Sequence, residues 1–255
     1  MAEKDLKNIE ATRNTANQMT FYDQLIDFCE NSGQSPFTKS RSFAAYAPRQ
    51  VITSFLERYE IFKLVQDVPG DIFECGVGSG QGLMAFAHFC AIHEPFCYTR
   101  RVVGFDTFSG FQGISEKDRT SKAAHLQEGG LAFDTYELLQ KAISLFDMNR
   151  PIGHIPKVEL VKGDISQSLP AFLTAHPATV VGLLYLDMDL YQATYDTLHL
   201  LKNRLAKGAV ICFDELNHRD YPGETLAVME TLGLPNVRLR KLPISANMCY
   251  AVVGE

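Results

Sequence analysis

The chain has 255 residues, 46% of them hydrophobic and 21% charged, with a formal net charge of −6. These totals are ordinary for a globular domain with a large core, and they exclude a disordered or fibrous chain. Without a dense run of Lys or Arg, a nucleic-acid partner is not expected.

The N-terminal stretch MAEKDLKNIEATRNTANQ is polar, so it is not expected to be a signal peptide, and no apolar run is long enough to span a membrane. The six cysteines form no CxxC pair, and Cys75 and Cys212 lie inside apolar runs. We therefore expect free thiols in a cytoplasmic protein, without a zinc site.

Residues 1–69 contain two amphipathic stretches, TFYDQLIDFCEN and PRQVITSFLERYEIFKLVQDV, and no strand pattern between them. They predict an N-terminal helical segment that caps the following domain or mediates subunit contacts. The stretch at 32–46 is expected to be a loop.

From residue 70 to 255 short apolar runs alternate with amphipathic stretches. This alternation predicts an α/β domain with a doubly wound, mostly parallel sheet of seven strands. The stretch at 70–80 is expected to be a strand followed by a glycine turn, and further strands are expected at 100–108, 157–165, 180–187, 208–216, 237–243 and 248–254. Helices are expected at 82–94, 133–146, 168–176, 193–205 and 223–233. The link ISAN between the last two strands is too short for a parallel crossover, which predicts an antiparallel end to the sheet.

The glycine turn ECGVGSGQG follows the first of these strands and opens a helix, with Ser79 available as N-cap. Its glycines are Gly76, Gly78, Gly80 and Gly82, and the dinucleotide fingerprint would require a glycine where Gln81 stands. The spacing is more typical of a site for an adenosyl amino acid, although a purely structural turn is an open alternative.

Acidic residues end the next two strands. Asp106, followed by Thr107, can accept hydrogen bonds from ribose hydroxyls, and Asp164, followed by Ile165, can meet an adenine amino group or cap a helix. The loop at 110–130 is long enough to be a binding loop or an irregular surface loop.

Carboxylates also end the fourth and fifth strands, at Asp187 and at Asp214–Glu215. Neighbouring parallel strands bring such groups to one edge, where three acids with no Lys or Arg beside them are expected to repel each other. A divalent cation such as Mg²⁺ is therefore expected, with turn and cap chemistry as the alternative. If the strand continues, Asp189 lies on the same side as Asp187. It could then be a metal ligand, a group that supports a ligand, or the N-cap of the following helix.

Three other side chains are weaker candidates. Asn217 and His218 lie just beyond Glu215 and could touch the metal or the acceptor, and His125 in the long loop could accept a proton.

The motifs FECGVGSGQG, GFDTFSGF, KGDISQSLP, LYLDMDLYQAT and FDELN, in this order, resemble the macrocin O-methyltransferase (TylF/MycF-type) family of class I methyltransferases. The resemblance runs from about Glu57 to the end. It implies an enzyme of natural product biosynthesis that uses S-adenosylmethionine and Mg²⁺ to methylate a hydroxyl of a small molecule, typically a deoxysugar or sugar nucleotide. It also implies a homo-oligomer.

The resemblance also assigns residues. The residues that it implies for cofactor binding are Glu74, Gly76, Gly78, Ser79, Gly80, Asp106, Thr107, Asp164 and Ile165. Asp187, Asp214 and Glu215 would hold the metal, with Asp187 also the base. Because the family more usually has two Asp where this chain has Asp214–Glu215, Asn217 is an alternative ligand to Glu215.

Other functions stay open beside this one. They are a metal-independent methyltransferase, a nucleotide-binding oxidoreductase, and a non-catalytic binder of S-adenosylmethionine.

Overall fold

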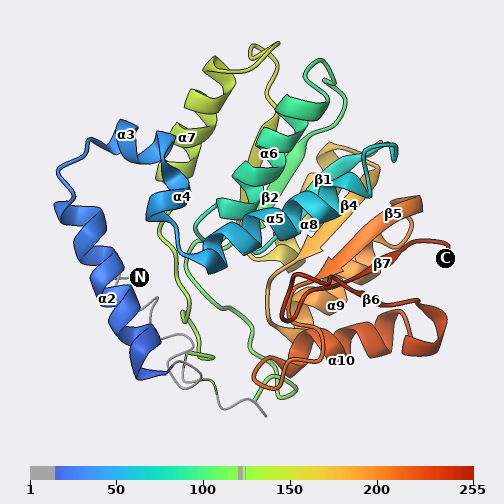
Figure 1. Cartoon of the computed structure of the whole chain (residues 1–255). Coiled ribbons are helices and arrows are strands. Elements are labelled where there is room, and N and C mark those ends of the chain that lie inside the picture. Colours follow the sequence, from blue (N-terminus) through green and yellow to red (C-terminus); the bar gives the residue numbers. More distant parts are fainter. Residues whose placement is uncertain (1–14, 120–122, 124) are drawn as a thin grey trace. The chain divides into compact units, whose positions relative to one another are not determined.

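The computed structural model describes residues 15–119, 123 and 125–255 (Figure 1). The chain divides into two compact units, residues 1–56 and 57–255. The sequence pattern placed this boundary at 69/70. The observed division falls within α5 (Arg49–Lys63), because Arg58, Ile61 and Phe62 are buried and belong with the following unit.

The N-terminal unit contains α2 (Ala16–Asn31), α3 (Pro36–Arg41), α4 (Phe43–Tyr46) and the first part of α5. The expectation of a loop at 32–46 is wrong, since α3 and α4 lie there. Ser35 accepts a hydrogen bond from the Thr38 amide and Pro36 occupies the first turn, which together start α3. None of the described residues 15–56 is buried.

The second unit is built on one sheet in the order β3-β2-β1-β4-β5-β7-β6. The strands are β1 (Asp71–Cys75), β2 (Val102–Asp106), β3 (Val158–Lys162), β4 (Val181–Leu186), β5 (Leu205–Phe213), β6 (Arg240–Lys241) and β7 (Cys249–Val252). β1 to β5 pair in parallel, whereas β7 pairs antiparallel with both β5 and β6. The predicted sheet is confirmed, although β6 is much shorter than the 237–243 expected.

Helices cover both faces of this sheet (Figure 1). They are α6 (Gln81–His93), α7 (Tyr136–Met148), α8 (Ile165–Ala175), α9 (Tyr191–Leu201), α10 (Pro222–Thr231) and the short 3₁₀ turn η1 (Leu234–Asn236). The second half of α5 packs with α6 and α7 on one face, and α8, α9 and α10 pack on the other.

Strand alternation divides the core into these two layers. In β4, Leu183 and Tyr185 join the layer of α5 to α7, whereas Leu184 and Leu186 join the layer of α8 to α10. All six residues of β4 are buried, which explains why its sequence is continuously apolar. The strand ends where this cover ends, immediately before Asp187.

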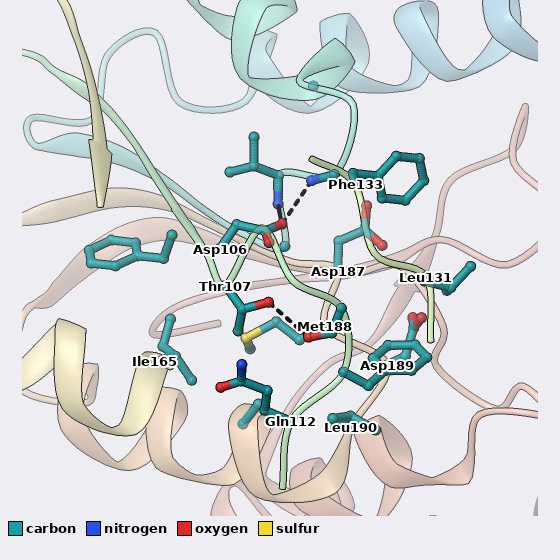
Figure 2. Close-up of a pocket in the computed structure, with 18 of the residues that line it drawn as sticks. Asp106, Thr107, Gln112, Leu131, Phe133, Ile165, Asp187, Met188, Asp189 and Leu190 are labelled. Carbon is teal, nitrogen blue, oxygen red and sulfur yellow. Dashed lines mark hydrogen bonds between the residues drawn. The ribbon is translucent and has the colours of Figure 1, made fainter. Parts of the chain in front are cut away.

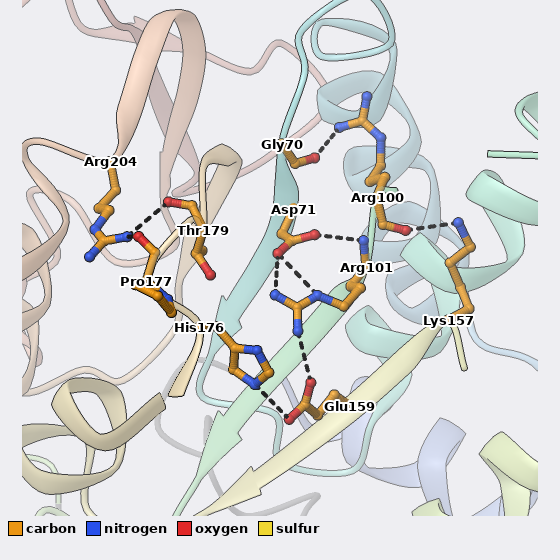
Figure 3. Close-up of polar contacts among 10 residues, drawn as sticks. All are labelled: Gly70, Asp71, Arg100, Arg101, Lys157, Glu159, His176, Pro177, Thr179 and Arg204. Atoms are coloured by element: carbon orange, nitrogen blue, oxygen red, sulfur yellow. Dashed lines mark hydrogen bonds and ion pairs between the residues drawn. The ribbon is translucent and has the colours of Figure 1, made fainter. Parts of the chain in front are cut away.

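At the amino ends of the strands, cationic side chains bind backbone carbonyls (Figure 3). Arg100, which is 6% exposed, donates to the carbonyls of Val65, Val68 and Gly70 over 2.9–3.1 Å. Lys157 donates to the carbonyl of Arg100 over 2.8 Å. The positive charges of Arg100 and Lys157 are thus paired with backbone carbonyls within the fold.

All six cysteines, which lie in the described part of the chain, are free. Among the described residues, no helix combines the length and the apolar character needed to cross a membrane.

Candidate active site

The glycine turn connects β1 to α6 and makes a close approach to the end of β4. Gly76 has φ +95°, and a Cβ built there would lie 1.8 Å from the carbonyl oxygen of Asp187. The Asp187 amide donates in turn to the Cys75 carbonyl over 2.8 Å. Only glycine fits at this contact, so residue 76 fixes the turn directly against Asp187.

Ser79 does not cap α6. The residue before the helix is Gly80, in the left-handed region at φ +84°, and its amide donates to the Val77 carbonyl over 2.8 Å. The tight turn therefore extends one residue further than the sequence suggested.

Asp106 at the end of β2 holds the glycine turn in place (Figure 2). Its Oδ2 accepts hydrogen bonds from the amides of Val77 and Gly78 over 2.7 and 2.8 Å, and its Oδ1 accepts one from Phe108 over 2.6 Å. Each carboxylate oxygen has about two lone pairs, so acceptor capacity remains for a ligand hydroxyl.

Asp164 caps α8. Its Oδ1 accepts from the amide and the hydroxyl of Ser166 over 2.8 and 2.6 Å. The cap role that the sequence left open is therefore present, and Asp164 and Ile165 still face the cavity described next.

A cavity of about 300 Å³ lies at the carboxyl ends of β1 to β4 (Figure 2). The sequence-predicted residues that line it are Gly76, Gly78, Ser79, Asp106, Thr107, Asp164, Ile165 and Asp187. Among the described residues, Glu74, Gly80, Asp214 and Glu215 are not part of its lining. The structure thus brings most of the predicted cofactor residues together around one space that also contains Asp187.

Three further segments complete the cavity. The sequence analysis left Asp189 and the loop at 110–130 open as candidates and gave the other residues of these segments no role. Gly110, Phe111 and Gln112 come from the long loop after β2, and Leu131 and Phe133 precede α7. Met188, Asp189 and Leu190 line it between β4 and α9.

Arg58 is the main residue that sequence reasoning missed. It lines the cavity, is 7% exposed, and places its guanidinium 4.7 Å from the ring centre of Tyr185. Its Nη2 lies 3.5 Å from Asp187 Oδ2 and its Nε lies 3.8 Å from Glu74 Oε1. The expectation that no Lys or Arg is near the acids is therefore wrong, because α5 brings Arg58 to them from outside the sheet.

A signal for Arg58 was present in the sequence. Arg58, Ile61, Phe62 and Val65 share the spacing of one helix face, and the last three are fully buried. A charged residue on an apolar helix face needs a buried partner, which Glu74 and Asp187 supply.

The strand-end acids form a mutually repelling group. Burial raises the pKa of Asp187 well above its usual range, with further contributions from Asp214 and Asp189, and Arg58 opposes the shift. Burial and Asp214 raise the pKa of Asp189 to about 7. Burial, followed by Asp189, Asp214 and Asp187, raises the pKa of Glu215 to about 10. A nearby positive charge would favour the ionised form of each.

Their all-oxygen chemistry suits Mg²⁺. Within the described residues, however, no group of three or more His, Cys, Asp and Glu side chains has an arrangement that could hold a metal ion. Asp189 does not continue the alternation of β4, which ends at Leu186, and it adopts φ +64°. It is not the cap of α9 either, since that position is Leu190.

The weaker candidates lie beside Glu215. His218 Nδ1 lies 3.4 Å from Glu215 Oε2, and the Asn217 amide donates to Thr225 over 2.8 Å. His125 Nε2 shares a hydrogen bond with the hydroxyl of Tyr221. His125 therefore contacts the start of α10, and none of these three residues lines the cavity in the described structure.

Three features of this fold are typical of the class I S-adenosylmethionine-dependent methyltransferases. They are the order of the strands, the antiparallel last strand, and a glycine turn whose amides donate to an acid at the end of β2. Comparison with known proteins agrees. The sequence model of the macrocin O-methyltransferase (TylF) family matches residues 56–227. No curated protein sequence matches the chain.

Solved structures add the fold. The crystal structure of CalS11, a calicheamicin methyltransferase, has a TM-score of 0.91 and 31% identity over 95% of each chain. Apo CalS11, a TDP-rhamnose 3'-O-methyltransferase, has a TM-score of 0.82 and 30% identity over 95% of this chain and 97% of its own. The O-methyltransferase NovP shares the fold at a TM-score of 0.63, with 23% identity over 79% of each chain.

This chain therefore belongs to the macrocin O-methyltransferase (TylF) family. It is an S-adenosylmethionine-dependent O-methyltransferase.

Proposed function

We propose that this enzyme transfers the methyl group of S-adenosylmethionine to a sugar hydroxyl, on a deoxysugar, a sugar nucleotide or a glycosylated natural product. One observation carries the proposal: the glycine turn, Asp106 and Asp187 line the same cavity. A cofactor bound along the turn would place its methyl group near a carboxylate that can accept a proton. The sugar substrate class is favoured by the 31% identity to CalS11, which acts on TDP-rhamnose.

Each part of the cavity has a role in this proposal. Glu74, Gly76, Gly78, Ser79 and Gly80 belong to the segment for the methionine part. Asp106 and Thr107 are proposed for the ribose, and Asp164 and Ile165 for the adenine. Glu74 would act from behind the turn, because it is 1% exposed and lies beside Arg58.

Asp187 is proposed as the base that takes the proton of the acceptor hydroxyl. Its side chain keeps 31% of its surface exposed, so a substrate can reach it. The backbone contact with Gly76 fixes its distance from the glycine turn, and such fixed placement is a main source of rate enhancement.

We further propose that Asp187, Asp214 and Glu215 bind Mg²⁺ after their side chains move together, since the described arrangement of these carboxylates does not form a three-ligand site. The raised pKa values of Asp187 and Glu215 support a need for added positive charge. When bound, the ion would lower the pKa of a hydroxyl group close to it. Asn217 is the alternative to Glu215.

The test begins with calorimetric titration of S-adenosylhomocysteine, with NAD as the control. Binding of the first alone supports the cofactor role, and binding of NAD would favour an oxidoreductase. Asp187→Ala should then abolish methyl transfer to a panel of TDP-sugars while leaving the affinity for S-adenosylhomocysteine nearly unchanged. Full activity of Asp187→Ala would overturn the role of Asp187.

One observation favours a second candidate, a metal-independent methyltransferase. Arg58 already supplies a cation 3.5 Å from Asp187. Activity measured in excess chelator separates the two: complete loss, restored by Mg²⁺, supports the metal site, whereas unchanged activity supports Arg58 as the resident cation.

We also propose that the N-terminal unit forms contacts between copies of the chain and shapes acceptor choice. Phe28, Phe37 and Phe43 are 46%, 71% and 58% exposed, and helices with so many exposed aromatic rings require a covering surface. Light scattering should give more than one chain per particle, and Phe37→Ser with Phe43→Ser should lower that mass. A monomeric parent protein would contradict the proposal.

A further inference from the structure

The loop after β2 is fastened to the start of α9 by one buried carboxylate. Asp118 is fully buried, although it lies in an irregular loop that is otherwise half-exposed or exposed around it. Its Oδ2 accepts from the amide and the hydroxyl of Ser115 over 2.8 and 2.6 Å. Its Oδ1 accepts from the amide of Tyr191, the first residue of α9, over 2.8 Å.

Tyr191 has no local substitute for this contact. The residue before α9 is Leu190, whose side chain cannot accept a hydrogen bond. Asp118 therefore supplies, from 73 residues earlier in the chain, both the acceptor and the negative charge that a helix start favours.

The space for this carboxylate depends on Gly223 at the start of α10. A Cβ built on Gly223 would lie 2.1 Å from Asp118 Oδ1 and 2.4 Å from the Tyr191 nitrogen. Its φ is not in the left-handed region, so the lack of a side chain here reflects close packing and not backbone conformation. Three separate segments thus meet at one buried carboxylate.

A second, exposed contact supports the first. Lys117 Nζ lies 2.5 Å from Glu230 Oε1 and 3.8 Å from the ring centre of Tyr191, whose hydroxyl donates to Glu230 Oε2 over 2.7 Å. Exposed ion pairs of this kind contribute little, so the buried Asp118 dominates.

Both segments joined by Asp118 are walls of the cofactor cavity. Phe111 and Gln112 precede it in the loop, and Asp189 and Leu190 precede Tyr191. We propose that Asp118 is a positioning residue, which holds the loop wall of the cavity against the β4–α9 wall and so sets the affinity for the methyl donor. This inference rests on the proposed role of the cavity.

Two substitutions test it from different elements. Asp118→Asn keeps the shape, but in either orientation of the amide an N–H faces one of the donors. Gly223→Ala leaves Asp118 intact and occupies its space. Replacing glycine by alanine in a helix is stabilising when the effect is purely local. Weaker cofactor binding by Gly223→Ala would therefore indicate that the added carbon displaces Asp118. Glu116→Gln, with the same charge change on a side chain that is 87% exposed, is the control.

Both variants should bind S-adenosylhomocysteine about tenfold more weakly or worse, while Glu116→Gln binds like the parent. The KM for S-adenosylmethionine should rise, whereas kcat should stay within about threefold of the parent value, since only donor positioning changes. Equal affinity in the parent and both variants would overturn the inference. Absence of binding in the parent would instead refute the proposed cavity role.

A proteolysis measurement without cofactor tests the role of Asp118 even if the parent protein does not bind S-adenosylhomocysteine or Asp118→Asn does not fold. Trypsin should cut the parent slowly after Lys117 and should cut Gly223→Ala there at least about tenfold faster. Equally rapid cleavage after Lys117 in both proteins would show that Asp118 does not hold the loop.

Discussion

The hydroxyl of Tyr185 donates a 2.6 Å hydrogen bond to Asp214 Oδ1, from within a strand whose residues are all buried. The same ring lies beneath the guanidinium of Arg58 at 4.7 Å. Tyr185 thus connects the acid that ends β5 with the cation that faces Asp187. The acids at the ends of β4 and β5 are held by one polar network and do not behave as independent groups.

Tyr185→Phe isolates the hydroxyl of that network, because the ring beneath Arg58 remains. The free energy of unfolding should fall by about 1.5–3 kcal/mol, the usual contribution of a hydrogen bond to a charged group. Any stabilisation by Mg²⁺ should shrink as well, since Asp214 loses the group that orients it. Urea unfolding with and without Mg²⁺ measures both.

Tyr195→Phe is the matched control, since the Tyr195 ring stacks on Tyr191 and His199 in α9. If Tyr185→Phe loses no more stability than Tyr195→Phe, the hydroxyl of Tyr185 does not support Asp214.

Arg58→Met should destabilise the protein by about 3–5 kcal/mol, because it leaves Glu74 and Asp187 without their buried partner. Arg58→Lys retains the charge and should lose less. Denaturant titration at pH 9, where Glu74 is ionised, provides the values, and Arg119→Met, at an exposed site, should stay close to the parent. A change in Arg58→Met as small as that in Arg119→Met would contradict the assigned network.

Gly76→Ala should prevent binding of S-adenosylhomocysteine or unfold the protein, because its Cβ would meet the Asp187 carbonyl at 1.8 Å. Gly113→Ala is a matched control, since φ is +73° there but nothing lies within 4 Å of the added carbon. Both variants impose the left-handed strain of about 1 kcal/mol, and only Gly76→Ala adds the clash. Calorimetry and thermal unfolding of the pair should therefore differ sharply; similar behaviour would argue against the close contact.

Glu74 predicts a pH dependence of stability. Burial raises its pKa to about 8, with Arg58 opposing the shift and Asp106 and Asp214 adding to it. Between the unfolded pKa of 4.5 and the folded value, the folded state binds the proton more tightly. The stability from this group is therefore fully present below pH 4.5 and is lost as the pH rises through about 8.

The effect of Glu74 is on the order of 5 kcal/mol at most. Urea unfolding at pH 5, 7 and 9 measures it, and Glu74→Gln should flatten the decline. Glu60→Gln, at a half-exposed site paired with Lys63, should leave the decline unchanged. A profile for Glu74→Gln parallel to that of the parent would show that other groups cause it.

The sheet could be predicted because its signals are local. The central strands β1, β2, β4 and β5 are largely apolar runs that end at a glycine or an acid, and burial on both faces of the sheet explains that pattern. The short helices α3 and α4 were missed because, at six and four residues, they are too short to show a helical period in the sequence. β6 was predicted too long because only two of its residues pair with β7.

The parts of the site that depend on backbone geometry could be predicted from the sequence. The parts that depend on the direction of side chains could not. The cavity gathers eight of the residues predicted at the strand ends because parallel strands end at one edge. Asp189 does not continue the alternation of the strand because its φ is positive. The sequence pattern does not predict a positive φ at this aspartate. Arg58 reaches the site from α5, and Asp118 contacts the Tyr191 amide beside the site from a loop. Such long-range contacts depend on tertiary packing.

The direct backbone contact between Gly76 and Asp187 has a consequence for how this family can diversify. The proposed donor-binding turn and the proposed base follow adjacent strands, whose separation is set by sheet hydrogen bonds, including that from the Asp187 amide to Cys75. Loops and the N-terminal unit can change their sequence without altering that spacing. A new acceptor would then need to be presented to an unchanged reaction centre, so substrate range and chemical competence can evolve separately.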